Sequence, residues 1–332
     1  MNIDQIKQKL AINGYDFVQG IGEGASASVF LAKSTKYNNF FAIKIVSTQK
    51  LIKQETESLI ALIHPYVIKL YSTFNDDEYT YLVMEYCHNG TLKQKGILEY
   101  EHFVHYAKEI LEVLEYCHSQ QIVHRDIKPD NIFVDQYDNI KLGDFGLSNK
   151  FNNEESARKK CGSLMFCSPE MIDETEYDPF KADIWALGIT FFYMITGQYP
   201  FTETSVDRLK DQILYNQINL TEYNIDPQIQ FLIMKMTSKN PLFRPSAHQL
   251  LKLPLFKPLR PEPIMKSISA YSIHNNIKRR SSPYLTFSSD HSDDIVIAPD
   301  IKKEGHLRLG KVHSFHRYNL KFNSHKHFIQ YE

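Results

Sequence analysis

Two glycines that could hold a phosphate group lie near the start of the chain, in Gly22-Glu23-Gly24. Glycine lets the backbone approach a phosphate closely and aim its N–H groups at it. The residues on both sides alternate as in strands, and Val29 closes the turn. A dinucleotide-binding fold would continue into a helix here, so the pattern argues against that fold. On its own, the glycine pair is more typical of an ordinary hairpin turn than of a phosphate site.

A lysine stands inside an apolar, strand-like run, Phe41-Ala42-Ile43-Lys44. A charged group on a buried face needs a partner. The simpler interpretation is an edge lysine whose ammonium group reaches solvent. Glu55 follows on a segment with helical spacing, on the face that could reach Lys44. Glu55 is therefore the candidate partner.

The most specific motif is His124-Arg125-Asp126-Ile127-Lys128-Pro129-Asp130-Asn131, and Asp144-Phe145-Gly146 follows thirteen positions after Asn131. With the lysine of Ala42-Ile43-Lys44, these residues form the AxK, HRDxKxxN and DFG motifs in order. The sequence thus resembles the eukaryotic protein kinases over about residues 15–256. The stretch from Cys161 to Phe166 is similar to the calcium/calmodulin-dependent and AMP-activated branch.

The resemblance implies that ATP is the phosphate donor and Mg²⁺ the metal. Phosphoryl transfer needs in-line positioning and cations to hold the spreading phosphate charge. Asp126 would orient the substrate hydroxyl and accept its proton. Lys128 would contact the γ-phosphate, and a lysine here is typical of serine/threonine kinases. Asn131 and Asp144 would bind Mg²⁺, which prefers oxygen ligands.

The same resemblance assigns the nucleotide site. The loop of Gly22, Glu23 and Gly24 would cover the phosphates, and Lys44 would hold the α- and β-phosphates while it pairs with Glu55. The other expected ATP-binding residues are Ile21, Val29, Ala42, the gatekeeper Met84, the hinge residues Glu85 and Cys87, and Phe133. Four residues resemble the stacked spine of active kinases, namely Leu59, Leu70, His124 and Phe145.

Further positions resemble the family's structural residues. Ser168-Pro169-Glu170 stands where the family has APE, and Arg244 is placed to pair with Glu170. Asp183, Trp185 and Gly188 match DxWxxG. We expect these residues to maintain the architecture and not to take part in the reaction.

Two departures concern the nucleotide site. Ala27 replaces the third glycine of the loop, which should stiffen it while still permitting a close approach. Only 11 positions separate Lys44 from Glu55, which is short for the family. Glu57 is an alternative partner, and Glu55 is preferred because it lies ten positions before Pro65.

A third departure concerns activation. Lys159 occupies the position where related kinases carry the phosphorylated threonine. A lysine cannot take a phosphate or neutralise Arg125, so the usual ordering of the loop by phosphate–arginine pairs is not expected. Ser156 could substitute, or Glu154 and Glu155 could pair with Arg125. We predict activity without a phosphorylated activation segment, and regulation by a partner protein is the alternative.

Substrate preference is only weakly encoded. Ser163 matches the residue that contacts the catalytic aspartate after the phospho-acceptor site. Asp130 could attract an upstream arginine, but Thr91 and Tyr193 stand where arginine-directed members often carry an acid. We expect a mild preference for basic substrates.

The resemblance implies the α+β, bilobed kinase fold, and the pattern around these motifs agrees with it. Strand-like runs and one helix, over about 49–63, fill residues 15–86, the expected β-rich lobe. Helical spacing dominates 90–256, the expected larger lobe, with short strands at 132–134 and 140–142. Residues 1–14 are assigned as an N-terminal extension.

Composition separates this domain from a tail. The 332 residues have a net charge of −1, but residues 257–332 carry 13 Lys and Arg against 7 Asp and Glu, so the rest of the chain is at −7. The tail has no apolar period, which predicts a mostly disordered segment. Its Lys278-Arg279-Arg280-Ser281-Ser282 could be an autophosphorylation site, a phosphoserine-reader site, a weak nuclear signal or a solvated linker.

The remaining observations exclude other classes. Four cysteines without a CxxC spacing argue against a disulfide framework and against zinc. No basic field favours nucleic acid, and no segment is long enough to span a membrane. The polar N-terminus predicts a cytoplasmic location, with the nucleus as an alternative. The predicted function is a serine/threonine protein kinase with protein substrates; the alternatives are a pseudokinase scaffold and a small-molecule kinase.

Overall fold

The computed structural model describes residues 3–24, 27–47, 53–150, 163–173 and 176–257. All of these residues belong to one compact unit, Met1–Glu262. Lys159, Ser156, Cys161 and the tail motif at 278–282 lie outside the described residues. None of the described helices is long and apolar enough to cross a membrane.

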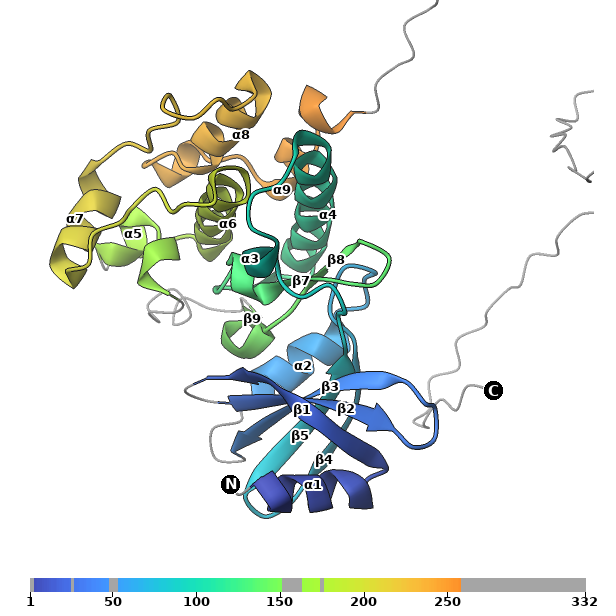
Figure 1. The fold of residues 1–332 in the computed structure, drawn as a ribbon. Helices are drawn as coiled ribbons and strands as arrows, with labels where there is room; N and C mark the ends of the chain where they lie inside the picture. Colours follow the sequence, from blue (N-terminus) through green and yellow to red (C-terminus); the bar gives the residue numbers. More distant parts are fainter. Residues whose placement is uncertain (1–2, 25–26, 48–52, 151–162, 174–175, 258–332) are drawn as a thin grey trace, which may run out of the picture. The chain divides into compact units, whose positions relative to one another are not determined.

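The N-terminal part is a five-stranded antiparallel sheet in the order β1-β2-β3-β5-β4 (Figure 1). Its strands are β1 (Tyr15–Glu23), β2 (Ala27–Ser34), β3 (Phe40–Ser47), β4 (Leu70–Asn75) and β5 (Tyr79–Glu85). β-branched and aromatic residues dominate β3 and β5, which suits the interior positions that these two strands occupy in the sheet. The helix α2 (Lys53–Ala61) follows β3, at the place predicted from helical spacing.

A helix precedes the sheet, α1 (Ile3–Ile12). Its buried residues, Ile6 and Leu10, lie in the same apolar cluster as Ile43 and Tyr81 of the sheet. From the sequence, residues 1–14 are expected only to form an N-terminal extension. The structure shows that this segment packs against one face of the sheet.

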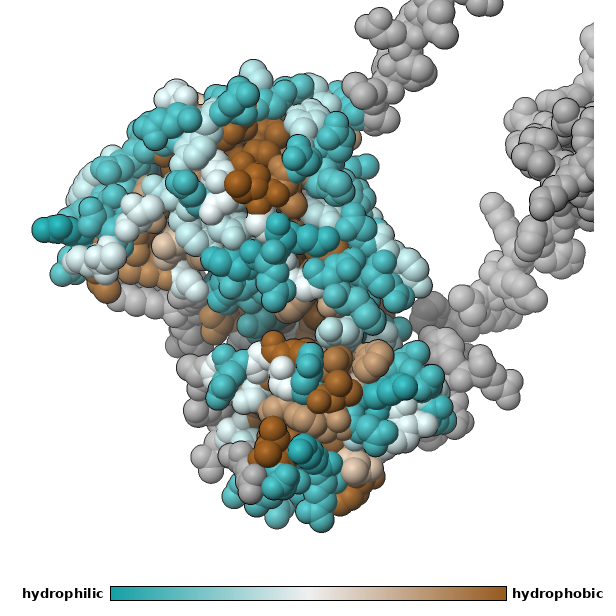
Figure 2. All heavy atoms as spheres, viewed as in Figure 1, coloured by the Kyte–Doolittle hydropathy of each residue, from teal (hydrophilic) through white to brown (hydrophobic). Residues whose placement is uncertain are grey.

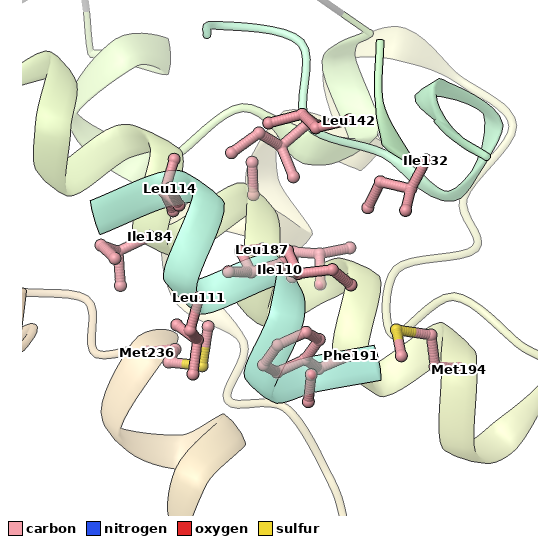
Figure 3. Packing of buried hydrophobic residues seen from close by; sticks show 14 of the residues in the cluster. Ile110, Leu111, Leu114, Ile132, Leu142, Ile184, Leu187, Phe191, Met194 and Met236 are labelled. Carbon is pink, nitrogen blue, oxygen red and sulfur yellow. The ribbon is translucent and has the colours of Figure 1, made fainter. Parts of the chain in front are cut away.

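The C-terminal part is mainly helical, as predicted. Its helices are α3 (Leu92–Lys95), α4 (Tyr100–Ser119), α5 (Pro169–Ile172), α6 (Pro179–Thr196), α7 (Val206–Tyr215), α8 (Pro227–Met236) and α9 (Ala247–Leu250). Figure 3 shows side chains of α4 and α6, including Ile110, Leu114 and Leu187, facing one another in the core. Apolar residues surround α6 on nearly all sides, as expected for a helix buried within its domain. The antiparallel sheet followed by this helical part confirms the α+β kinase fold.

Two short strand pairs lie between α4 and α5. One joins β6 (Ile122–Val123) to β9 (Asn149–Lys150), and the other joins β7 (Ile132–Val134) to β8 (Ile140–Leu142). Single turns of 3₁₀ helix at Pro129–Asn131 and Phe145–Leu147 adjoin β7 and follow β8. The HRDxKxxN and DFG motifs therefore lie on the segments that connect these strands.

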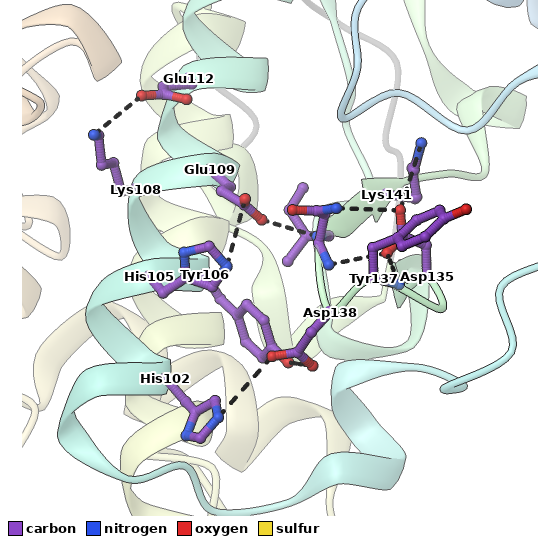
Figure 4. Close-up of polar contacts among 12 residues, drawn as sticks. His102, His105, Tyr106, Lys108, Glu109, Glu112, Asp135, Tyr137, Asp138 and Lys141 are labelled. Carbon is purple, nitrogen blue, oxygen red and sulfur yellow. Dashed lines mark hydrogen bonds and ion pairs between the residues drawn. The ribbon is translucent and has the colours of Figure 1, made fainter. Parts of the chain in front are cut away.

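A polar network attaches the β7–β8 hairpin to α4 (Figure 4). The backbone N–H of Ile140 donates to Glu109 Oε2 at 2.9 Å, and the Tyr106 hydroxyl donates to Asp138 at 2.6 Å. Burial raises the pKa of Glu109, although the hydrogen bond from Ile140 opposes this shift. Asp138 has a φ of 65°, so the Tyr106 contact also fixes a turn in the left-handed region.

Candidate active site

The HRDxKxxN segment folds so that two polar side chains converge on one carboxylate oxygen. Asp126 Oδ2 accepts from Lys128 Nζ at 2.6 Å and from Asn131 Nδ2 at 2.9 Å. The other oxygen, Oδ1, is buried and has no hydrogen-bond partner among the described residues. Because a buried carboxylate oxygen without a partner is costly, Asp126 is suited to accept a hydrogen bond from a bound hydroxyl.

Asp183, on α6, fixes the start of this segment. It accepts from the backbone N–H of His124 at 2.9 Å and of Arg125 at 2.8 Å, and its Oδ2 lies 3.0 Å from His118 Nε2. Arg125 has a φ of 66°, a conformation that costs a non-glycine residue about 1–3 kcal/mol. The carboxylate of Asp183 offsets this cost because it accepts from both backbone N–H groups.

His124 connects the Asp126 segment to the DFG segment. Its Nδ1 lies 3.3 Å from the backbone N–H of Asp126, and its Nε2 lies 2.9 Å from the carbonyl of Gly143. These contacts require Nδ1 to accept and Nε2–H to donate, which assigns the neutral Nε2–H tautomer. The His124 ring also lies 4.8 Å from the ring of Phe145. One buried imidazole therefore positions both motifs.

Lys44 of β3 reaches the first residue of the DFG motif. Its ammonium group lies 2.8 Å from Asp144 Oδ1. Burial raises the pKa of Asp144, but the charge and hydrogen bond of Lys44 outweigh burial and keep that pKa below its ordinary value. The carboxylate is thus held in its ionised form, as a metal ligand must be.

The predicted partner of Lys44, Glu55, lies on α2, but its side chain and that of Glu57 are outside the described residues. The helix itself packs against the DFG turn. Ser148 Oγ donates to Ser58 Oγ at 2.9 Å, and Leu59 lies in the same apolar cluster as Phe145. Leu70 is partly buried against the same apolar cluster. Of the four residues expected to form the spine, His124 and Phe145 are in direct ring contact.

Asn131 and Asp144 provide donors that fit Mg²⁺. Asn131 Nδ2 donates to Asp126 twice, so the amide oxygen is the atom left for a cation. The N–H of Gly143 donates to the carbonyl of Asn131 at 2.9 Å, which brings Asp144 beside Asn131. No group of three or more His, Cys, Asp or Glu able to hold a metal occurs within the described part of the chain. Mg²⁺ needs only one or two such ligands when phosphate oxygens and water complete its shell.

Strand register brings the residues predicted to contact adenine together. Ala42 pairs with Met84 across β3 and β5, and Val29 pairs with Lys44 across β2 and β3. Phe133, another expected ATP-binding residue, forms a β-bridge with Thr91 in the segment that follows β5. Met84 and Cys87 are buried, whereas Ile21 is exposed on β1. In the glycine loop, the N–H of Gly24 donates to the Ala27 carbonyl at 2.9 Å.

Gly143 provides the space that this arrangement needs. A Cβ atom at Gly143 would lie 2.8 Å from Cε2 of Phe133. The residue before the DFG motif therefore packs directly under the Phe133 ring. The only feature of the sequence that marks this glycine is its position directly before the DFG motif.

Lys141 was also missed. It lies opposite Phe133 in the β7–β8 register, and its ammonium group is 2.9 Å from Glu85 Oε1. Glu85 also accepts from the backbone N–H of Lys69 at 3.2 Å. The predicted hinge residue Glu85 is thus attached to both parts of the chain that flank the site.

The expected ion pair between Arg244 and Glu170 forms. Arg244 Nη1 and Nη2 lie 2.6 and 2.7 Å from the two carboxylate oxygens of Glu170. The remaining guanidinium N–H groups donate to the carbonyls of Lys181, Ser238 and Lys239. All five donors of a fully buried arginine therefore have acceptors.

Comparison with known proteins agrees with this geometry. Residues 15–256 match the family model of the protein kinase domain. The chain is 35% identical over 245 residues to a probable serine/threonine-protein kinase KIN1 homolog of Enterocytozoon bieneusi, covering 71% of this chain and 41% of that protein. It is 30% identical over 303 residues to the carbon catabolite-derepressing protein kinase of Saccharomyces cerevisiae, covering 86% and 47%.

A third relative is CBL-interacting protein kinase 32 of Oryza sativa, 29% identical over 270 residues, with 76% and 60% covered. The chain spans about half the length of these relatives. These matches identify the family: the chain belongs to the protein kinase family and carries a serine/threonine protein kinase domain. The resemblance to the calcium/calmodulin-dependent and AMP-activated branch is confirmed.

Proposed function

We propose that this chain is an active kinase that transfers the γ-phosphate of ATP to serine or threonine hydroxyls of proteins. The observation that carries the proposal is the geometry of Asp126, whose Oδ2 is held by Lys128 and Asn131 while Oδ1 is left to accept from a substrate. Lys44 and Asp144 supply the charge pair expected beside the phosphates and metal. A pseudokinase scaffold would have no need for this set of residues.

In this proposal, each side chain acts on the nucleotide or on the substrate hydroxyl. Asn131 and Asp144 would hold Mg²⁺, which supplies positive charge to the phosphates when bound. Lys44 would hold the α- and β-phosphates, and Lys128 would turn toward the γ-phosphate as negative charge spreads over its oxygens. Asp126 would orient the hydroxyl and accept its proton. Ile21, Gly22, Glu23, Gly24, Val29, Ala42, Met84, Glu85, Cys87 and Phe133 would surround ATP.

The surroundings of Asp126 also support a protein substrate. Ser163 Oγ lies 3.4 Å from Lys128 Nζ, and a small pocket beside Asp126 is lined by Ser163, Phe166 and Cys167. This is where a residue that follows the phospho-acceptor would lie. A small-molecule substrate would not need such a subsite.

Upstream selectivity should be weak for arginine. Lys93 Nζ lies 4.9 and 4.6 Å from the ring centroids of Tyr193 and Tyr199 and donates to the Tyr199 hydroxyl at 2.6 Å. Its positive charge lies close enough to Asp130 for the two to interact. Lys93 therefore weakens the attraction of Asp130 for a basic side chain.

We further propose activity without a phosphorylated activation segment, because Lys159 stands at the usual phosphothreonine position. The test uses protein expressed in bacteria, treated with phosphatase that is then removed, and assayed on casein with phosphoamino-acid analysis. The proposal predicts phosphoserine or phosphothreonine on casein, at equal rates before and after treatment. A rate that falls on dephosphorylation, together with an equal loss in Ser156→Ala, would refute the independence from phosphorylation.

A further inference from the structure

A cluster of exposed apolar side chains lies far along the chain from the proposed active-site residues. Leu242 and Phe243, in the turn between α8 and α9, are 83% and 71% exposed, and Phe231 on α8 is 49% exposed. Figure 2 shows an apolar area over the part of the molecule where Figure 1 places α8 and α9. Neither the fold nor the proposed reaction uses these side chains.

The exposed side chains border a groove and do not form a flat patch. The groove has a volume of about 560 Å³, within the range of sites that bind small molecules or side chains. The buried side chain of Leu250 contributes to its floor, with Pro245 and Leu253 beside it. We name this feature the α8–α9 groove; its apolar lining is Phe231, Leu242, Phe243, Pro245, Leu250 and Leu253.

The charged residues that line the groove, Lys181, Lys235 and Arg244, are all basic, and of these three only Arg244 is neutralised by a carboxylate of the described residues, that of Glu170. Between Pro227 and Lys257 the sequence holds four lysines and one arginine but no Asp or Glu, within a domain whose net charge is −7. Lys235 is exposed at the rim and lies 5.3 Å from the Phe231 ring centroid. Lys252 is also exposed, one position before Leu253.

We propose that the α8–α9 groove is a docking site for a linear segment of a partner protein that carries large apolar side chains flanked by Asp or Glu. The apolar side chains would enter the groove, and the carboxylates would meet the lysines at its rim. A second copy of the chain bound through the same face would bring lysine against lysine. A membrane would cover the protruding Leu242 and Phe243 but would leave the hollow behind them unfilled.

The test uses the full chain and fluorescein-labelled peptides of about 12 residues, a length that spans a groove of this kind. The peptides carry two central Phe or Leu residues flanked by Asp and Glu, by Lys and Arg, or by Asn and Gln. They contain no Ser, Thr or Tyr, so the kinase reaction cannot report on them. Fluorescence polarisation then measures binding at low and at physiological salt.

The acidic peptide should bind at least about tenfold more tightly than the basic and neutral ones, and less tightly as salt rises. Leu242→Ser combined with Phe243→Ser should weaken binding about tenfold or more, and Lys235→Glu should also weaken it. Both variants change exposed side chains, so a thermal-unfolding curve like that of the wild type is expected. Tyr215→Ser and Arg208→Glu, which alter exposed residues of α7, are the matched controls and should bind like the wild type.

Three results would overturn the proposal. The first is a lack of selectivity: either all three peptides bind the wild type equally, or the acidic peptide binds the wild type and the Leu242 and Phe243 variant equally. The second is binding of anionic phosphatidylserine vesicles, lost in that variant, without peptide binding, which would make the face a membrane site. The third is concentration-dependent self-association in sedimentation, lost in that variant, without peptide binding, which would make the partner a second copy.

Discussion

The buried pair of Arg244 and Glu170 offers a quantitative test of what holds the helical part together. The guanidinium is fully buried, makes five hydrogen bonds and lies 4.9 Å from the Trp185 ring centroid. Replacing Arg244 by Met removes the charge that lies against Glu170 and leaves three backbone carbonyls without this donor. Breaking a buried ion pair from one side destabilises a protein by about 3–5 kcal/mol.

That range can be converted into an unfolding temperature. For a domain of this size, 1 kcal/mol shifts the midpoint of thermal unfolding by about 2–4 °C. Arg244→Met should therefore lower the midpoint by about 6–20 °C. Arg244→Lys keeps the charge but has only three donors and no planar fork, so it should lose about 1–3 kcal/mol.

Circular dichroism during thermal and urea unfolding measures these differences. Adding Glu170→Gln to Arg244→Met should recover part of the loss, because a buried amide is less costly than a buried carboxylate facing no arginine. Arg208→Met, which changes an exposed arginine of α7, should stay within about 0.5 kcal/mol of the wild type. If Arg244→Met also stays within about 1 kcal/mol, the pair does not stabilise the fold as argued.

Three further predictions concern Gly143 and Asp183, beside the proposed site, and Lys239 in the helical part. Gly143→Ala should push the Phe133 ring away. It should weaken ATP binding, measured by calorimetry, and lower the free energy of unfolding by about 1–3 kcal/mol. If neither value changes, Gly143 does not pack against Phe133 as described. Burial opposes ionisation of Asp183, but the contacts with His118 and with the backbone lower its pKa below the ordinary value. The ionised carboxylate therefore stabilises the fold at neutral pH, and this stabilisation is lost as pH falls through the lowered pKa. Asp183→Asn should thus be less stable than the wild type at pH 7, by a margin in urea unfolding that shrinks below about pH 4; a constant margin would contradict this. Burial lowers the pKa of Lys239 to about 8 because it disfavours the charged ammonium group. At pH 7 the free energy of unfolding should therefore be smaller for the wild type than for Lys239→Met, and this difference should narrow as pH rises from 8 to 10. A difference that widens over this range would contradict the lowered pKa.

The sequence was sufficient for the parts of the site that depend on local motifs. It predicted the fold class, the position of α2, the short strands at 132–134 and 140–142, and the Arg244–Glu170 pair. These features are local or are fixed by strongly specific residues.

What the sequence could not predict depends on contacts between distant segments. The helix α1 packs on the sheet because Ile6 and Leu10 join the apolar cluster that contains Ile43. The ten residues of α1 are rich in polar side chains, and their sequence does not indicate this partner. The two backbone N–H groups that donate to Asp183 belong to residues almost sixty positions earlier in the chain. Arg125 adopts its positive φ where it makes this contact. The Gly143 contact with Phe133 likewise needs the hairpin register.

The central claim is that this chain is an active kinase in which Asp126 is the acceptor of the substrate proton. The most direct test measures transfer of radiolabelled γ-phosphate from Mg-ATP to casein by the wild type and by Asp126→Asn. The account predicts transfer by the wild type and a rate lower by at least about a hundredfold in the variant, with ATP-dependent thermal stabilisation kept in both. Equal rates in the two proteins, or ATP binding by the wild type with no transfer, would contradict it.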